Sequence, residues 1–210
     1  MKNTSLYLLV IIIALLLGAA SVAVYKEFAS SSVYQTQNLS LASEYNSSSV
    51  TTIAWSALLP VSERDLLRKY QIDQMLPLNE QILTSLQAAN DTDYKAALTS
   101  NQTVSTFVDK AVRISGFIVP IDVNQQQGVT RFFLVPYYGA CLHYPPPPPN
   151  QVIHVTTDTG FAEFDLNQAY TLSGFLRLGL FEDPLGTAAY AFDLVQITPY
   201  SGEPDDVRQH

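Results

Sequence analysis

The residues of this 210-residue chain that could support chemistry gather in one short run, GACLHYPPPPPNQ, at positions 139–151. The run holds the chain's only cysteine, Cys141, and a histidine, His143, and a second histidine, His154, follows closely. Thiolate and imidazole are good ligands for zinc and copper, and three protein ligands leave one coordination position open. The spacing therefore predicts a zinc or copper site formed by Cys141, His143 and His154.

This metal site depends on one strand register. Cys141 and His143 share a face of an extended segment, because side chains alternate along a strand. If a hairpin closes over residues 144–151 with His143 opposite Val152, then Cys141 lies opposite His154. A shift by one residue would send the side chains to opposite faces. Two alternatives stay open: Cys141 packs as a small apolar residue, or its thiol is a catalytic nucleophile.

Catalysis has little support beyond this Cys-x-His pair. A cysteine nucleophile needs an activating base and an oxyanion donor, and the pair supplies only proximity. The sequence contains no CxxC, G-x-S-x-G or HExxH motif and no phosphate-binding glycine loop. The nearby acidic residues Asp158, Glu163 and Asp165 are explained by a solvated loop. We therefore expect a protein that is not an enzyme.

The proline run, residues 145–149, suggests a different use of the same region. Consecutive prolines form a stiff left-handed helix that loses little entropy when a partner docks on it. Tyrosine rings pack well on proline faces. The alternative to a metal site is therefore an interaction surface made of Tyr137, Tyr138, Tyr144, Pro145, Pro146, Pro147, Pro148, Pro149 and Asn150.

The segments around the run alternate apolar and polar residues, as strands do. We expect strands at residues 111–119, 130–135, 152–156, 169–177 and 190–199. The first and fourth both contain Ser-Gly-Phe, where the glycine permits a bend or bulge. Five short strands predict a mainly β (α+β) fold: a small five-stranded, OB-like barrel at residues 108–200. A two-layer β-sandwich is the rival architecture.

A helical section is expected before the barrel, at residues 53–107. Trp55 should anchor the core, and Ser62 is placed as the N-cap of a first helix. A second helix should start at Asn79, with Ile82, Leu83 and Leu86 on one face. We expect these one or two helices to cover one side or end of the sheet. Residues 201–210 form a flexible acidic tail.

The N-terminal segment indicates the compartment. Residues 6–25 are uncharged and apolar, and twenty residues of helix span about 30 Å, the thickness of the hydrocarbon core. Residues 1–26 are therefore a signal anchor in the inner membrane or a cleaved signal peptide. Both alternatives place the remainder in the periplasm. Residues 27–52 are rich in Ser, Thr, Asn and Gln, which predicts a polar tether.

Composition limits the partners. The formal net charge is −8, and no Lys or Arg cluster is present, which excludes a nucleic-acid partner. Apolar residues make up 47% and charged residues 14%, which is typical of a chain that forms a core. A single cysteine cannot form an intrachain disulfide. The fold must therefore be stabilised by packing alone.

The segments VRISGFIVPIDV, FFLVPYYGACLHYPPPPPNQVIHV and WSALLP resemble a family of proteobacterial envelope proteins, domain of unknown function 3299. The resemblance covers roughly residues 108–199, with WSALLP as an outlying match. It implies a lipoprotein or secreted protein, although this chain has no N-terminal cysteine for a lipid. It also implies accessory work in metal uptake with components of an ABC-type envelope transporter.

We therefore expect a non-enzymatic periplasmic accessory binding protein, with metal uptake as its leading role. A structural or protein-interaction module that uses the polyproline and tyrosine surface is the alternative. A thiol-dependent enzyme is the second alternative.

Overall fold

The computed structural model of the chain describes residues 18, 32–70, 75–140 and 146–205. The chain divides into two compact units, Met1–Ser32 and Val33–His210. All elements discussed below belong to the second unit. The apolar segment at residues 6–25 lies outside the described residues apart from Gly18. Within the described ranges, no helix is both long and apolar enough to cross a membrane.

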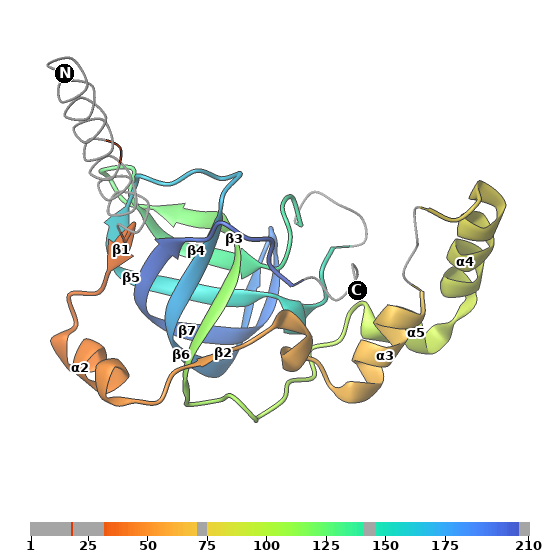
Figure 1. Cartoon of the computed structure of the whole chain (residues 1–210), viewed down its shortest axis with the longest axis horizontal. Coiled ribbons are helices and arrows are strands. Elements are labelled where there is room, and N and C mark those ends of the chain that lie inside the picture. The colour runs from red at the N-terminus through yellow and green to blue at the C-terminus, as the bar shows by residue number, and fades with distance from the viewer. Residues whose placement is uncertain (1–17, 19–31, 71–74, 141–145, 206–210) are drawn as a thin grey trace, which may run out of the picture. The chain divides into compact units, whose positions relative to one another are not determined.

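Five long strands of the described chain close into a barrel (Figure 1). They are β3 (Ala111–Val123), β4 (Val129–Val135), β5 (Ile153–Phe161), β6 (Ala169–Asp183) and β7 (Gly186–Pro199). The order around the barrel is β3-β4-β5-β7-β6 and back to β3, with β5 and β7 parallel and the other neighbours antiparallel. This arrangement confirms the predicted small β-barrel of OB-like type and not the sandwich.

Alternating apolar side chains fill the barrel. On β4, Phe132 and Leu134 are fully buried in the main core cluster, and Leu172 on β6 and Ile197 on β7 belong to the same cluster. Residues two apart share a face of a strand, so each strand supplies every second side chain to this core. The two-residue period in the sequence therefore identified the barrel correctly.

The two Ser-Gly-Phe glycines lie where another backbone comes close. A Cβ on Gly174 would lie 2.1 Å from the carbonyl oxygen of Asp193, and one on Gly116 would lie 2.5 Å from that of Val135. The pairing of β6 with β7 also shifts register between Ser173 and Gly174. Gly174 therefore occupies a bulge, as the sequence pattern predicted.

The hairpin of β6 and β7 is longer than predicted. Pairing continues beyond the expected strand ends, through Phe181 opposite Ala188 to Asp183 opposite Gly186. A register shift between Leu178 and Phe181 accommodates the irregular sequence and lets the two strands remain paired.

Residues 33–52 correct the prediction of a polar tether. They form β1 (Tyr34–Gln35), α2 (Leu39–Ser47) and β2 (Thr51–Thr52), and β1 and β2 pair with β7 and β3. The Asn38 side chain caps α2 by accepting a hydrogen bond from the Leu41 N–H at 3.1 Å. Tyr45 is buried edge-on against Phe175, with ring centroids 6.0 Å apart. One cap and one buried ring thus order a segment that is polar overall.

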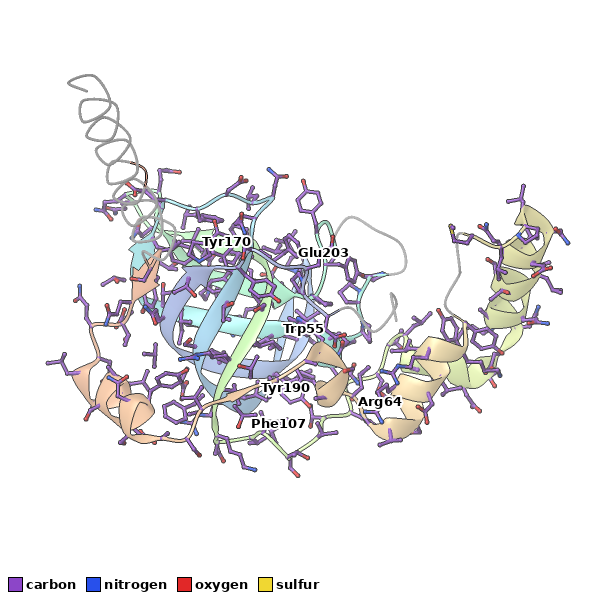
Figure 2. The ribbon with its side chains drawn as sticks, in the orientation of Figure 1. Trp55, Arg64, Phe107, Tyr170, Tyr190 and Glu203 are labelled. Atoms are coloured by element: carbon purple, nitrogen blue, oxygen red, sulfur yellow. The ribbon has the colours of Figure 1, made fainter. Side chains whose placement is uncertain are left out.

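The helical section contains η1 (Trp55–Leu58), α3 (Val61–Lys69), α4 (Leu78–Asn90) and α5 (Thr92–Ala97). Trp55 is buried at the barrel, as predicted, close to Tyr190 (Figure 2). Helix α3 starts at Val61 with Pro60 in the N-cap position, so Ser62 is not the cap. Ile82, Leu83 and Leu86 of α4 are each more than half exposed, so this helix does not cover the barrel as expected.

Candidate functional site

The described part of the proline run begins as an extended helix and ends in a turn. Pro148 has φ −63° and ψ 154°, which are polyproline II values. Pro149 already belongs to a short 3-10 helix, η2 (Pro149–Gln151), in which the Gln151 N–H donates to the Pro148 carbonyl at 2.8 Å. The extended part therefore stops at Pro148, one residue earlier than the sequence suggested.

A buried polar network holds the end of the run against α3. Asn150 is fully buried, and its Nδ2 donates to Glu63 Oε2 at 2.7 Å and to the Gln102 carbonyl at 2.9 Å. Ser100 Oγ donates to the other carboxylate oxygen of Glu63 at 2.6 Å. Each oxygen of the buried Glu63 side chain thus has a donor, as a buried carboxylate requires. Asn150 is an anchor for the run and not part of an exposed interaction surface.

The next residue connects the same turn to the barrel. Gln151 Nε2 donates to the Trp55 carbonyl at 3.0 Å, and Trp55 Nε1 donates to the Ser115 carbonyl of β3 at 2.7 Å. Tyr190 OH donates to the Leu58 carbonyl at 2.9 Å from inside the barrel (Figure 2). Side-chain to backbone hydrogen bonds therefore fix the end of the proline run relative to β3 and β7.

The proline run forms one wall of an apolar pocket of about 370 Å³. The end of α5 and the tip of the β6–β7 hairpin form other walls, and the outer face of the barrel forms the floor. The lining residues are Leu98, Thr99, Phe133, Pro146, Pro147, Pro149, Val152, Leu185, Gly186 and Thr187. This proline-walled pocket lies at the lower end of the size range of small-ligand sites, and no charged side chain lines it.

The other residues predicted for an interaction surface differ in their exposure. Pro146 is exposed, Pro147 and Pro149 are half-buried, and Pro148 is buried. Tyr138 is exposed and packs edge-on against Phe117 of β3 at 5.9 Å, and Tyr137 is half-buried against the cluster that contains Phe133. Tyr144 and Pro145 lie outside the described residues.

His154 does not occupy the register that the metal prediction assumed. It pairs with Phe133 of β4, whose last residue is Val135, so Cys141 cannot be its partner in this ladder. The register is set by the core, because Phe132 faces the barrel interior and its neighbour Phe133 must then face outward beside His154. Cys141 and His143 lie outside the described residues, so the predicted metal set stays a prediction. The described ranges contain no cluster of three His, Cys, Asp or Glu side chains.

The His154 imidazole is held against an aromatic ring. It stacks on Phe181 at 3.7 Å between centroids with an interplanar angle of 9°, and Arg131 lies over the Phe181 ring at 5.3 Å. Burial lowers the pKa of His154, the positive charge of Arg131 lowers it further, and Asp183 opposes the shift. The imidazole is therefore neutral at neutral pH and serves as an aromatic contact between β5 and the β6–β7 hairpin.

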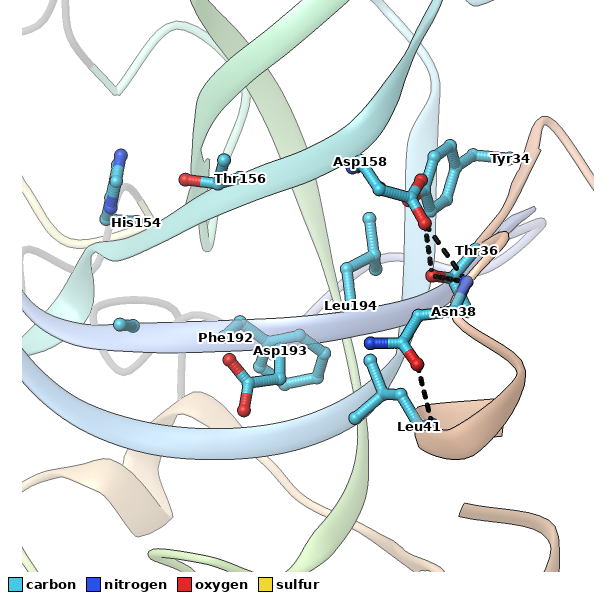
Figure 3. Close-up of a pocket in the computed structure, with 11 residues that line it drawn as sticks. Tyr34, Thr36, Asn38, Leu41, His154, Thr156, Asp158, Phe192, Asp193 and Leu194 are labelled. Carbon is cyan, nitrogen blue, oxygen red and sulfur yellow. Dashed lines mark hydrogen bonds between the residues drawn. The ribbon is translucent and has the colours of Figure 1, made fainter. Parts of the chain in front are cut away.

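A second cavity of about 380 Å³ lies along the outer face of β5 and β7 (Figure 3). Its lining includes Asp158, which lies on β5 and accepts hydrogen bonds from Tyr34 OH, from Thr36 Oγ1 at 2.6 Å and from the Gln37 N–H at 2.7 Å. Partial burial would raise the pKa of Asp158, but these hydrogen bonds outweigh it and lower the pKa to about 2. Asp158 is therefore an ordered anchor for β1 and not a residue of a solvated loop.

The other carboxylate of this cavity is also paired. Asp193 accepts a hydrogen bond from Arg177 Nε at 2.7 Å, and the guanidinium also contacts Asp109. The charged groups of the β5–β7 cavity thus have partners within the protein. The proline-walled pocket has no charged lining residue that is already paired within the protein, and it is the better candidate for binding.

The chain matches the family described as "Protein of unknown function (DUF3299)" over residues 55–199. The chain belongs to this family. A crystal structure of a DUF3299 family protein from Pseudomonas aeruginosa PAO1 is similar, with 30% sequence identity and a TM-score of 0.51. That similarity covers 72% of this chain and 97% of the other. No curated protein matches. The DUF3299 match includes Glu63, the proline run and every lining residue of the proline-walled pocket.

Sequence reasoning missed the partners that organise this site. Glu63 follows Ser62, so its sequence position indicated only an acid in the first turn of a helix, and Ser100 and Gln102 carried no motif at all. The nearest available signal was the Asn-Gln pair directly after the prolines. Buried amides at the end of a rigid segment commonly serve to fix it, since they must find hydrogen-bond partners.

Proposed function

We propose that this DUF3299 protein is a non-enzymatic binding module of the cell envelope whose proline-walled pocket holds an apolar side chain of a partner protein. The observation that carries the proposal is the pocket itself, about 370 Å³ in volume and lined by prolines, leucines and Phe133. A pocket with apolar walls gains affinity by removing an apolar group from water.

The rigidity of the proline wall supports a role in binding a partner. Proline restricts φ at each position of the run, and the hydrogen bonds of Asn150 and Gln151 fix its end to α3 and η1. A surface that is already ordered loses little conformational entropy when a partner docks. The pocket is therefore ordered before a ligand arrives.

Exposed leucines of the β6–β7 hairpin supply further apolar surface. Leu185 lines the pocket and is half exposed, and Leu178 and Leu180 of the same hairpin are more than half exposed. An exposed apolar side chain at the rim of a pocket, such as Leu185, adds apolar surface for a protein partner to cover. These leucines favour a protein partner over a small free molecule, which would use the pocket alone.

The periplasmic location in this proposal rests on the apolar segment at residues 6–25. A more specific role, accessory work in metal uptake, rests on the family resemblance and on Cys141 and His143. It has less support than the interaction role, because His154 stacks on Phe181 and pairs with Phe133. We therefore place the protein-interaction role first.

Peptide selection on the full chain in lipid nanodiscs tests the proposal. Phage-displayed peptides are selected on the wild type and then compared on Thr99→Trp, in which a bulky ring fills the pocket from the end of α5. Thr92→Trp, at the exposed start of α5, is the matched control. We expect peptides with one common apolar residue, whose affinity falls at least about tenfold, or 1.4 kcal/mol, on Thr99→Trp. Peptides that bind all three proteins equally would contradict the proposal.

A further inference from the structure

Helix α4 exposes most of its apolar side chains. Leu78, Ile82, Leu83 and Leu86 are 71%, 51%, 55% and 56% exposed. These four residues are called the α4 stripe below. A helix on the surface of a globular protein normally turns such residues toward the core. The α4 stripe instead faces away from the remainder of the folded unit.

The attachment of α4 explains this orientation. Gln81, Thr84 and Ala88 lie on one face and are the less exposed positions of α4, and the helix contacts α5. Leu78, Ile82 and Leu86 also recur every four residues, on a different face. The helix is therefore attached by the narrow face of Gln81, Thr84 and Ala88, and its apolar face remains exposed.

The predicted membrane segment lies close to the start of the folded unit. The apolar stretch ends at Tyr25 and β1 starts at Tyr34, so residues 26–33 connect them. Eight residues reach at most about 28 Å, because an extended chain advances roughly 3.5 Å per residue. An anchored chain would therefore hold its folded unit next to the bilayer surface.

We propose that the α4 stripe docks on the lipid surface of the membrane that holds the N-terminal segment. The proposal rests on the envelope location proposed above, with residues 6–25 as an uncleaved anchor. A tethered surface meets the bilayer at a high effective concentration, so even weak apolar contact suffices. The sequence of α4 carries one charged residue, Glu80, so the helix does not repel anionic lipids strongly.

A second copy of the chain is a poorer occupant. A stable protein interface buries roughly 800 Å² per partner, and four side chains on a 13-residue helix supply only part of this area. Contact with lipid does not need this minimum buried area when the chain is already anchored in the same membrane. In Figure 1, β1 and α4 lie at opposite ends of the folded unit, so docking requires this unit to lie along the membrane.

Tryptophan quenching by brominated lipid tests the docking. The full chain is placed in nanodiscs with lipids brominated near the headgroup or left unbrominated. The native Trp55 is buried in the barrel and gives a constant background. Ile82→Trp places a reporter in the α4 stripe, and Glu80→Trp places one two residues away on another face. We expect the added emission of Ile82→Trp to fall by about half, because interfacial helices insert roughly 5–10 Å.

Each result has a distinct meaning. A carbonate wash of membranes that carry the chain tests the anchor separately. If the chain stays on the washed membranes but the emission of Ile82→Trp is the same with both lipids, the anchor is retained and the docking is overturned. Release by the wash overturns the anchor and the docking together. If Ile82→Trp is not quenched and the chain forms a concentration-dependent dimer that Leu83→Glu abolishes, the α4 stripe binds a second copy of the chain and not lipid. Quenching of Ile82→Trp with little quenching of Glu80→Trp supports the proposal.

Discussion

Glu63 is a buried carboxylate whose two oxygens are bound by uncharged donors, Ser100 and Asn150. Three distant parts of the chain meet at this one side chain: α3, the segment after α5, and the end of the proline run. Removing one donor leaves a charged acceptor without its hydrogen bond in a buried place, which costs more than an ordinary hydrogen bond contributes. The network therefore makes Asn150 an informative position at which to test how the pocket wall is fixed.

Asn150→Ala should lower the free energy of unfolding by about 1–3 kcal/mol, the cost of an unsatisfied buried polar group. Urea denaturation at pH 7 measures the change. The matched control is Asn101→Ala, an exposed asparagine in the neighbouring segment, whose effect should remain within about 0.5 kcal/mol. Equal stability of the two variants would show that the Glu63 network does not fix the proline run.

His154 makes the stability of the protein depend on pH. Burial and Arg131 lower the pKa of His154 in the folded chain, whereas the unfolded chain has the ordinary value of about 6.5. Below pH 6.5 the unfolded chain binds a proton at His154 more readily than the folded chain does. The stability that the neutral His154 contributes is therefore fully present above this pH and is lost as the pH falls. His154→Phe keeps a ring against Phe181 and removes the titration.

We therefore expect wild type and His154→Phe to diverge as the pH of urea denaturation falls from 7.5 to 5. The wild type should lose more stability over this window. Other titrating groups act on both proteins, so the difference between them isolates His154. A constant difference across the window would show that the His154 pKa is not lowered.

The proline run matters at the scale of the element, because it limits the unfolded chain and shapes the pocket. Replacing Pro146, Pro147 and Pro148 with serine should lower the free energy of unfolding by about 0.4–1 kcal/mol per residue through unfolded-state entropy. The burial of Pro148 adds a packing loss to this effect. Urea denaturation gives the stability, and affinity for the selected peptides gives the function. Unchanged stability with lost affinity would make the run a recognition surface alone.

The barrel strands could be predicted because their residues alternate. Burial on one face forces a two-residue period, and Phe132 and Leu134 show it directly in the sequence. The segment at residues 33–52 could not be predicted, because its order depends on Tyr45 meeting Phe175 and on Asp158 meeting Tyr34 and Thr36. These contacts join residues more than a hundred positions apart and leave no local pattern.

The candidate site was predictable only in its location. Five consecutive prolines marked the correct region, but their neighbours in space, Leu98 and Leu185, come from α5 and the β6–β7 hairpin. The apolar face of α4 was also recognised from its spacing. Its exposure was not, because periodicity shows which residues share a helix face and not what that face meets.

At the scale of the whole molecule, charge and membrane attachment act together. The chain's net charge of −8 repels anionic lipid in general. The uncharged α4 stripe would then select the orientation in which α4 meets the bilayer. The proline-walled pocket would face a partner in the same compartment.

The compartment itself is the last prediction. Residues 33–210 should lie on the periplasmic side, because one apolar span follows a short N-terminal segment that carries Lys2. A fluorescent protein that matures only in the cytoplasm, fused after His210, should be dark, and alkaline phosphatase at the same position should be active. Deleting residues 1–26 should reverse both signals and serves as the control. Bright fluorescence from the full-length fusion would place the folded unit in the cytoplasm and remove the basis for an envelope partner.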